Sequence, residues 1–324
     1  MVKRVLPALK RVVARLPEFL LGIAILGTAG APLGIWSSHV ERMSHFRLWW
    51  LGLLLVLALW YFWRRRLMPG LAAAVVAVWA FMPLLPYWHE PSPVSSSSKE
   101  VPLKVITWNV LWSNDHKPEA LAWLASQDAD IILLTECTTD WRAALSTLTT
   151  AYPHQLSSER DGAEGMWLLS RYPLDLPDPE GLAANKPWLA TVIHSPAGPL
   201  RFLGMHPRTP RAGARFDERN AQFDKAAVIA AQATTSAMPL LLMGDLNCTP
   251  FSPWFSRLLE RGALRDCAIG FGLTGTWTGQ GVRLPIDHIL VNNRFSLLDY
   301  HVEADWHGSD HRPVAATLAV EIAP

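Results

Sequence analysis

The segment "LLLMGDLNCTP", residues 240–250, ends an apolar run with a carboxylate and an amide, Asp245 and Asn247, placed two positions apart. Residues two apart in an extended chain point to the same side. Further apolar runs also end in polar side chains, at Asn109, Glu136, His206, Asp287, Asp310 and His311. Taken singly, a Gly-Asp pair indicates a turn and a lone histidine a structural role. As an ordered set, these residues suggest one site built from strand ends.

The elements that must position these residues are strands alternating with helices. Apolar runs predict strands, and Lys117-Pro118-Glu119 is typical of a helix start. Strands are expected at 103–110, 129–136, 166–174, 188–195, 200–207, 239–247, 286–292 and 309–321. Helices are expected at 117–127, 214–236 and near 252–262. The pattern predicts an α/β fold that brings polar strand ends together.

The order of the motifs "WNV…TE…HP…GDLN…IDHI…SDHRP" resembles the endonuclease/exonuclease/phosphatase superfamily over residues 103–320, and "SRYPL" at 170–174 is similar to a common stretch of that family. "GDLN" and "SDHRP" are the specific elements. The resemblance implies a four-layer α/β sandwich, with two packed mixed sheets flanked by helices and the site at one end of the sheets. It also implies a phosphoric ester hydrolase.

Hydrolysis of a phosphodiester needs a cation to neutralise the phosphate, and oxygen ligands suit Mg²⁺ or Mn²⁺. Glu136 is the predicted metal ligand, assisted by Asn109 and Asp310, although Asp310 could instead contact a ligand rather than the metal. By similarity to the family, Asp245 orients or deprotonates the attacking water. Asn247 would donate from its amide to the phosphoryl oxygen.

The resemblance gives two histidines roles beside the phosphate. His311 is expected to act protonated, with Asp287 accepting its other N–H and raising its pKa. His206 would assist protonation of the leaving group, with a purely structural role as the alternative. Among the basic residues, Arg208 and Arg171 are candidate substrate contacts. The alternative for Arg208, Arg211, Arg215 and Arg219 is a solvated helix face.

Charge divides the chain into unlike parts. Residues 1–98 hold ten Lys/Arg and three Asp/Glu. Residues 99–324 hold nineteen Lys/Arg and twenty-five Asp/Glu, which gives them a net charge of −6. Nucleic-acid binding draws on Lys/Arg contacts to phosphates, so this balance argues against a broad duplex-binding surface. The three cysteines match no zinc pattern and are expected to be buried thiols, although Cys137 and Cys248 could form a redox-sensitive pair.

Residues 1–88 are predicted to form a membrane region, with about three transmembrane helices at 19–36, 46–63 and 67–88, each charge-free or nearly so. The alternatives are two spans with one re-entrant or interfacial segment, a signal peptide, or a buried helical core. Lys/Arg clusters near residues 3–15 and 64–66 predict cytoplasmic segments. Residues 89–100 would then be a Pro/Ser-rich linker, and 101–324 a catalytic domain on the extracytoplasmic face of a cell or inner membrane.

The sequence therefore predicts a membrane-anchored, divalent-metal-dependent phosphodiester hydrolase, nuclease-like, that cleaves by in-line attack of an activated water. The expected partners are the bilayer and a phosphodiester, either nucleic acid or a phospholipid headgroup; no protein partner is predictable. A sphingomyelinase-like phosphodiesterase and a phosphomonoesterase are the alternatives. A membrane scaffold of the same fold without activity is a further one.

Overall fold

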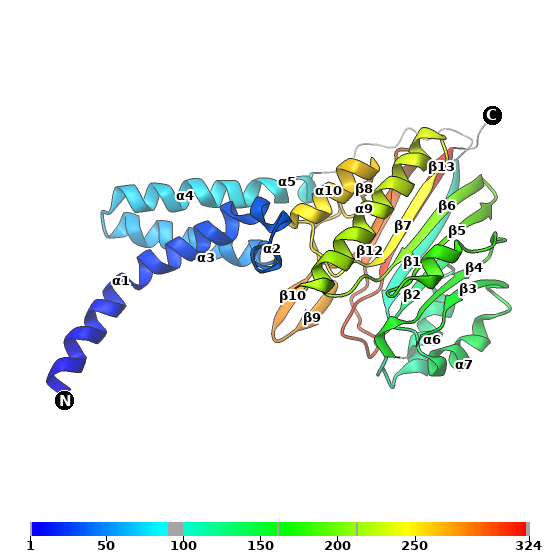
Figure 1. Ribbon diagram of the computed structural model, residues 1–324, viewed down its shortest axis with the longest axis horizontal. Helices are drawn as coiled ribbons and strands as arrows, with labels where there is room; N and C mark the ends of the chain where they lie inside the picture. Colours follow the sequence, from blue (N-terminus) through cyan, green and yellow to red (C-terminus); the bar gives the residue numbers. More distant parts are fainter. Residues whose placement is uncertain (1, 90–99, 161, 212, 322–324) are drawn as a thin grey trace. The chain divides into compact units, whose positions relative to one another are not determined.

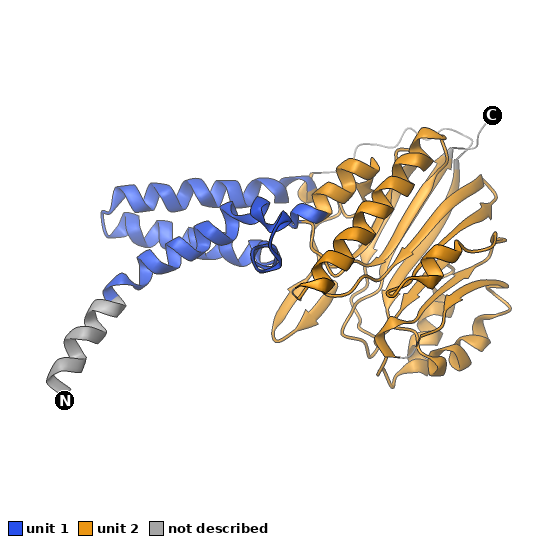
Figure 2. Ribbon diagram, in the orientation of Figure 1, with its two compact units in different colours: residues 1–86, 251–254 blue, residues 87–250, 255–324 orange. Residues whose placement is uncertain are grey.

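The computed structural model describes residues 2–89, 100–160, 162–211 and 213–321 and divides the chain into two units (Figures 1 and 2). One comprises residues 1–86 and 251–254, and the other comprises residues 87–250 and 255–324. Most of the predicted linker, 89–100, lies outside the described residues. The predicted site residues all belong to the second unit.

The first unit is helical. Its elements are α1 (Val2–Ala29), η1 (Ala31–Ile35), α2 (Ser38–Ser44), α3 (Arg47–Trp63), α4 (Leu67–Phe81), η2 (Met82–Leu84) and the start of α5 (Leu85–Trp88). Small residues such as Ala73, Ala77 and Ala80 on α4 are buried in its core together with Leu54 and Tyr61 of α3. The outward positions of the same two helices are apolar as well, including Leu59, Trp63, Val75 and Val78. Helices that are apolar all round are typical of a large core or of a membrane span.

The described residues do not support three membrane spans. One stretch, Leu67–Trp88, is long enough and apolar enough to cross a bilayer. The helices Ser38–Ser44 and Arg47–Trp63, which are bent by 67° relative to each other, form a second candidate if they are counted as one span. The predicted stretch 19–36 is not a single helix, because α1 ends at Ala29 and the short η1 follows. Pro32 has no backbone N–H to donate, so it favours this break.

The second unit is built on two mixed sheets. The order β12-β13-β1-β2-β4-β3 forms the first sheet and β5-β6-β7-β11-β8 the second. The first contains β1 (Glu100–Asn109), β2 (Ile131–Thr135), β3 (His154–Ser158), β4 (Met166–Ser170), β12 (Phe295–Val302) and β13 (Val314–Glu321). The second contains β5 (Trp188–Ser195), β6 (Gly198–Met205), β7 (Leu240–Asp245), β8 (Arg265–Asp266) and β11 (Asp287–Val291). A separate ribbon pairs β9 (Trp277–Gly279) with β10 (Val282–Leu284).

The sheets pack face to face and helices cover their outer faces (Figure 1). Val105 and Leu133 of the first sheet meet Leu241 and Ile289 of the second in one buried cluster. The helices are α6 (Lys117–Ser126), α7 (Thr139–Leu145), α8 (Pro179–Ala183), α9 (Ala214–Thr235) and α10 (Pro253–Gly262), with the short η3 (Ser146–Leu148) and η4 (Gly162–Glu164). The predicted layered α/β sandwich is confirmed.

Strand direction brings distant residues to one edge, which we call the site edge. β1 and β2 are parallel, with Asn109 beside Thr135, and β6 and β7 are parallel as well. β11 runs antiparallel to β7, which places Asp287 at its start beside Asp245 at the end of β7. Gly244 allows the ends of β6 and β7 to approach each other closely, because it has φ +142° and a Cβ there would lie 1.8 Å from the Met205 carbonyl oxygen.

Candidate active site

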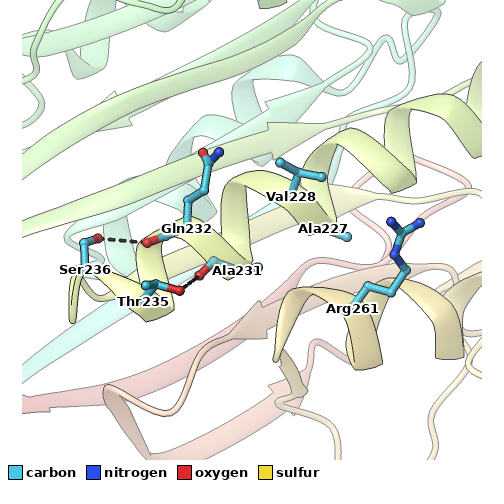
Figure 3. A pocket seen from close by; sticks show the side chains of 7 residues that line it. All are labelled: Ala227, Val228, Ala231, Gln232, Thr235, Ser236 and Arg261. Atoms are coloured by element: carbon cyan, nitrogen blue, oxygen red, sulfur yellow. Dashed lines mark hydrogen bonds between the residues drawn. The ribbon is translucent and has the colours of Figure 1, made fainter.

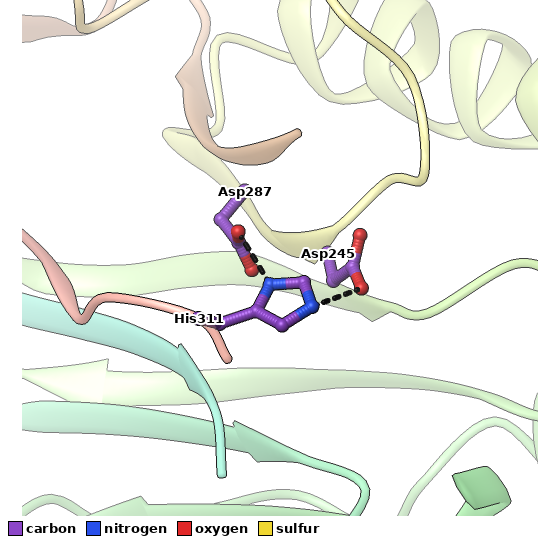
Figure 4. Close-up of side chains that lie close together, drawn as sticks. All are labelled: Asp245, Asp287 and His311. Carbon is purple, nitrogen blue, oxygen red and sulfur yellow. Dashed lines mark hydrogen bonds and ion pairs between the residues drawn. The ribbon is translucent and has the colours of Figure 1, made fainter. Parts of the chain in front are cut away.

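His311 lies between two buried carboxylates at the site edge (Figure 4). Its Nδ1 is 2.8 Å from Asp287 Oδ2, and its Nε2 is 3.7 Å from Asp245 Oδ2. The backbone of the histidine is fixed from two sides. Its N–H donates to Ser309 Oγ, and its carbonyl oxygen accepts from the Trp108 indole. A ring held in this way can present only one edge to a substrate.

The electrostatics of this cluster favour an ionised pair. Burial alone would lower the pKa of His311, but Asp287 and Asp245 together raise it to about 10. Burial alone would raise the pKa of the Asp245 carboxyl, but the His311 and His206 rings and the Asn247 N–H hold it well below its usual range. At neutral pH the ring is therefore an imidazolium and Asp245 a carboxylate.

Asn109 and Glu136 extend the site from the first sheet. The Asn109 amide donates to Glu136 Oε1 at 3.0 Å and to Asp245 Oδ2 at 3.1 Å. Glu136 Oε2 accepts from the Trp112 N–H at 3.3 Å. Glu136 follows β2 with φ +59°, a conformation that is uncommon for a residue other than glycine and often occurs at functional sites.

His206 approaches the same carboxylates from the end of β6. Its Nε2 is 3.5 Å from Asp245 Oδ2 and 3.9 Å from Glu136 Oε1. On the other side of the ring, Lys186 Nζ lies 3.4 Å from Nδ1 and also donates to the Ala163 carbonyl oxygen. An ammonium group can only donate, so Nδ1 is the acceptor and Nε2 carries the hydrogen that faces the carboxylates.

Lys186 is the residue of this site that sequence reasoning missed. It is 5% exposed, and burial lowers its pKa to about 8, partly offset by the carboxylates of Glu164, Asp245 and Glu136. It lies in "NKPW", which contains no motif and precedes the strand β5. A lone charged residue before an apolar run was the only available signal.

Substitution of Lys186 by methionine removes the donor that holds the His206 ring. We expect kcat for phosphodiester hydrolysis to fall about tenfold, equal to about 1.4 kcal/mol of lost transition-state stabilisation, with little change in KM. Steady-state kinetics check this. Lys225→Met is the matched control, since Lys225 lies on α9 and pairs with Glu180. Equal kcat values for both variants would contradict a role for Lys186.

Two further predicted residues lie nearby but make other contacts. Asp310 Oδ2 accepts from the Trp277 indole at 3.0 Å, and within the described part of the chain Asp310 forms no hydrogen bond with Glu136 or Asn109. Asn247, at φ +49°, donates from its backbone to Asp245 Oδ1 and from its amide to the Pro207 carbonyl oxygen. Asn247 therefore supports the conformation of Asp245.

The predicted arginine contacts fit less well. Arg171 follows β4, and β4 is antiparallel to β2, so Ser170 pairs with Ile131 at the end of the sheet away from Glu136. Its guanidinium pairs with Asp128 and Asp130, so a substrate contact by Arg171 is not supported. Arg208 lies two residues after His206 but pairs with Glu164 at 2.7 Å.

The solvated-helix alternative for the basic cluster is also wrong at one position. Arg219 is completely buried, and its guanidinium stacks on the rings of Phe216 and Phe223. It therefore contributes to packing rather than to a basic surface. The cysteines are buried and free, and burial raises the pKa of the Cys137 thiol, which disfavours the reactive thiolate.

The donor set at the site edge fits a divalent cation. Ligand atoms of Asp245, Asp287 and His311 lie within 4.8 Å of one another. A protonated His311 has no lone pair to give to a metal, so the oxygen atoms of the carboxylates are the candidate ligands in this group. Asp287 Oδ1 is buried with no hydrogen-bond partner in the described structure. Glu136 and Asn109 add oxygen atoms of the kind that hard cations prefer.

A surface hollow elsewhere in this unit is not the site. It has a volume of about 500 Å³ and lies along α9 (Figure 3). Its lining residues are Ala227, Val228, Ala231, Gln232, Thr235, Ser236 and Arg261. None of these side chains is a carboxylate or an imidazole, so the hollow lacks the groups needed for acid–base chemistry.

Two packed mixed sheets with an Asp–His–Asp cluster and a Glu–Asn pair at one edge define a class of hydrolases acting on phosphate esters. The chain belongs to the Endonuclease/Exonuclease/phosphatase family, whose profile matches residues 106–311. No curated protein sequence matches the chain.

Solved structures share the fold at low sequence identity. The 3′ phosphatase NExo from Neisseria, bound to a product DNA hairpin, is 21% identical with a TM-score of 0.56, covering 66% of this chain and 98% of its own. Truncated Caenorhabditis elegans TDP2 is 17% identical with a TM-score of 0.56, covering 67% and 97%. Sphingomyelinase C from Streptomyces griseocarneus is 17% identical with a TM-score of 0.50, covering 67% and 99%.

Proposed function

We propose that this protein is a divalent-metal-dependent phosphodiesterase with nuclease-like activity, held at a membrane by its N-terminal helices. The observation that carries the proposal is the buried His311 between Asp287 and Asp245, with Asn109 and Glu136 hydrogen-bonded to the same cluster. The raised pKa of His311 and the lowered pKa of Asp245 favour the imidazolium and the carboxylate that attack of water on a phosphate ester requires.

Each residue then has a role that follows from its contacts. Asp245 is an ionised acceptor that orients the attacking water and takes its proton. His311 is an imidazolium kept in place by Asp287, and it donates from Nε2 to a phosphoryl oxygen as negative charge develops there. His206, with its Nε2 hydrogen directed by Lys186 toward the carboxylates, faces the same Asp245 oxygen as His311 and assists the leaving oxygen as a hydrogen-bond donor.

Glu136 and Asn109 would hold the cation, Mg²⁺ or Mn²⁺, and Asp310 is a third candidate ligand. When bound, the cation neutralises phosphate charge and stabilises the oxygen that leaves. Because the Asn109 amide is bonded to both Glu136 and Asp245, a cation held by Glu136 and Asn109 would supply positive charge close to the water-orienting carboxylate.

Turnover of bis(p-nitrophenyl) phosphate by the full-length chain tests the proposal. We expect hydrolysis with Mg²⁺ or Mn²⁺ and loss of activity in EDTA, restored when either metal is added back. Activity that persists in EDTA would reject the metal-dependent mechanism. Absence of turnover with every divalent metal would favour the scaffold alternative.

The membrane part of the proposal is supported by the apolar outer faces of α3 and α4. Arg64, Arg65 and Arg66 directly precede the stretch Leu67–Trp88, and such basic residues remain cytoplasmic. The catalytic domain would then lie on the extracytoplasmic face. Protease treatment of intact cells should digest it, and protection of the domain until the membrane is permeabilised would contradict this topology.

A further inference from the structure

Two arginines converge on one tryptophan next to the active site. The Cζ atom of Arg312 is 4.6 Å from the Trp306 ring centroid, and that of Arg283 is 5.7 Å away. Arg283 is exposed, whereas Arg312 and Trp306 are half-buried. We call these three residues the Arg–Trp–Arg cluster. None of them has a role in the proposed mechanism.

The cluster is connected to the catalytic histidine through backbone contacts. Arg312 directly follows His311, and its N–H donates to the Thr276 carbonyl oxygen at 2.7 Å. The ribbon β9–β10, which carries Arg283, forms a bridge between Trp277 and His311, and the Thr278 N–H donates to the Asp310 carbonyl oxygen. Arg283 pairs with Thr278 in this ribbon, so the cluster is carried by backbone that contacts residues 310 and 311 directly.

The two guanidinium groups lack the ion pairs that neutralise other arginines of this acidic unit. Arg208 and Arg142 each contact a glutamate within 2.8 Å. Across the described ranges, neither Arg283 nor Arg312 forms an ion pair with a carboxylate, and Arg312 Nε is buried without a hydrogen-bond partner.

The two acidic residues that flank Trp306 and Arg312 in the sequence accept hydrogen bonds from other donors. Asp305 Oδ1 accepts from the N–H groups of Trp306 and His307, and Asp310 Oδ2 accepts from the Trp277 indole. Two like charges near one ring repel each other unless an anion lies between or beside them. The arrangement thus calls for an anionic ligand.

We propose that the Arg–Trp–Arg cluster binds the nucleotide next to the scissile phosphodiester in single-stranded nucleic acid. This inference rests on the proposed function and names its substrate class. Guanidinium groups bind phosphate oxygens in a bidentate manner. Indole rings and guanidinium planes are surfaces on which bases stack. A choline headgroup carries a positive charge and would be repelled by both arginines, so the cluster disfavours a sphingomyelinase-like substrate.

Binding of a fluorescein-labelled single-stranded oligonucleotide to the full-length chain tests this inference. Fluorescence anisotropy in EDTA measures affinity without turnover, so the result does not depend on catalysis. We expect Trp306→Leu and the double substitution Arg283→Ala/Arg312→Ala each to weaken binding about tenfold. Trp306→Phe keeps an aromatic face and should bind within about threefold of the wild type.

Charge is tested separately by the salt dependence of binding. Removal of both arginines should lower the slope of log K against log [salt] by about 1.4, or about 0.7 for each phosphate that is no longer neutralised. Arg261→Ala is the matched control, because Arg261 is an exposed arginine of α10 that pairs with Asp224. It should leave both the affinity and the slope unchanged, and circular dichroism verifies that every variant is folded.

The outcomes separate this inference from the proposed function. Wild-type turnover of bis(p-nitrophenyl) phosphate together with unweakened oligonucleotide binding in the cluster variants overturns the inference alone. Absence of that turnover rejects the proposed function, whereas the anisotropy result still decides whether the cluster binds nucleic acid. Loss of binding to phosphoinositide vesicles without loss of oligonucleotide binding would assign the cluster to a lipid and overturn the inference as well.

Discussion

Replacement of Asp245 by asparagine should lower kcat for phosphodiester hydrolysis by about 10³–10⁴-fold, because general-base and charge effects are lost together. The carboxamide keeps the shape of the side chain, but its single oxygen can accept from only one of the two donors, the Asn109 amide or the Asn247 N–H. It cannot take a proton from water, and it removes the negative charge that helps to keep His311 protonated. Initial rates at saturating substrate measure the effect.

Asp266→Asn is the matched control for this prediction. Asp266 is also a buried carboxylate, but it accepts from the Tyr87 hydroxyl and the Ala268 N–H, and within the described residues it forms no hydrogen bond with the site. We expect the free energy of unfolding to change, which thermal unfolding measures, and kcat to stay within about threefold of the wild type. If Asp245→Asn also kept its activity within that range, Asp245 would not be the base.

Replacement of His311 by glutamine should lower kcat by about 10³-fold, since the only imidazolium of the Asp–His–Asp cluster is lost. Glutamine fills a similar volume and can still donate one hydrogen bond to Asp287 from its amide, but it carries no charge. The effect should appear in kcat more than in KM, because the charge on the phosphoryl oxygens grows toward the transition state.

His288→Gln provides the control for the second prediction. His288 is a buried histidine on the same strand as Asp287, and its Nε2 contacts the Cys248 carbonyl oxygen. Its loss should change stability without a large change in kcat. The double variant of Asp245 and His311 should be about as slow as the worse single variant, because residues that act as one unit are not additive. A fall in kcat equal to the product of the two single-variant falls would show that the two residues act independently.

The alternation of apolar runs and polar ends predicted much of the catalytic unit. Strand patterns ending at Asn109 and Glu136, and the run ending at Asp245, correspond to β1, β2 and β7. Apolar strands buried on both faces are readable in this way because their side chains all require exclusion from water. β3 and β12 escaped prediction, since "HQLSS" and "FSLLDYHV" are partly exposed edge strands with weak patterns.

The apolar pattern does not predict the direction in which a strand runs, and this is why Arg171 was expected at the site edge. The sequence predicts a strand at 166–174 that contains this residue, but only the antiparallel pairing of β4 with β2 carries Arg171 to the end of the sheet away from Glu136. The sequence also did not predict the break in the first apolar stretch, where Gly30 lies between α1 and η1 and Pro32 stands near the start of η1. Apolar composition shows where a helix lies more readily than it shows whether that helix is continuous.

By itself, the sequence determined the residue types of the site, their order along the chain and the strands that carry them, because burial of apolar runs is a local requirement. Tertiary structure alone decided which groups meet. The register of β11 on β7 places Asp287 beside Asp245, and the fold brings Lys186 to His206 and two arginines to Trp306. These contacts depend on the pairing and packing of distant segments, and no local pattern encodes them.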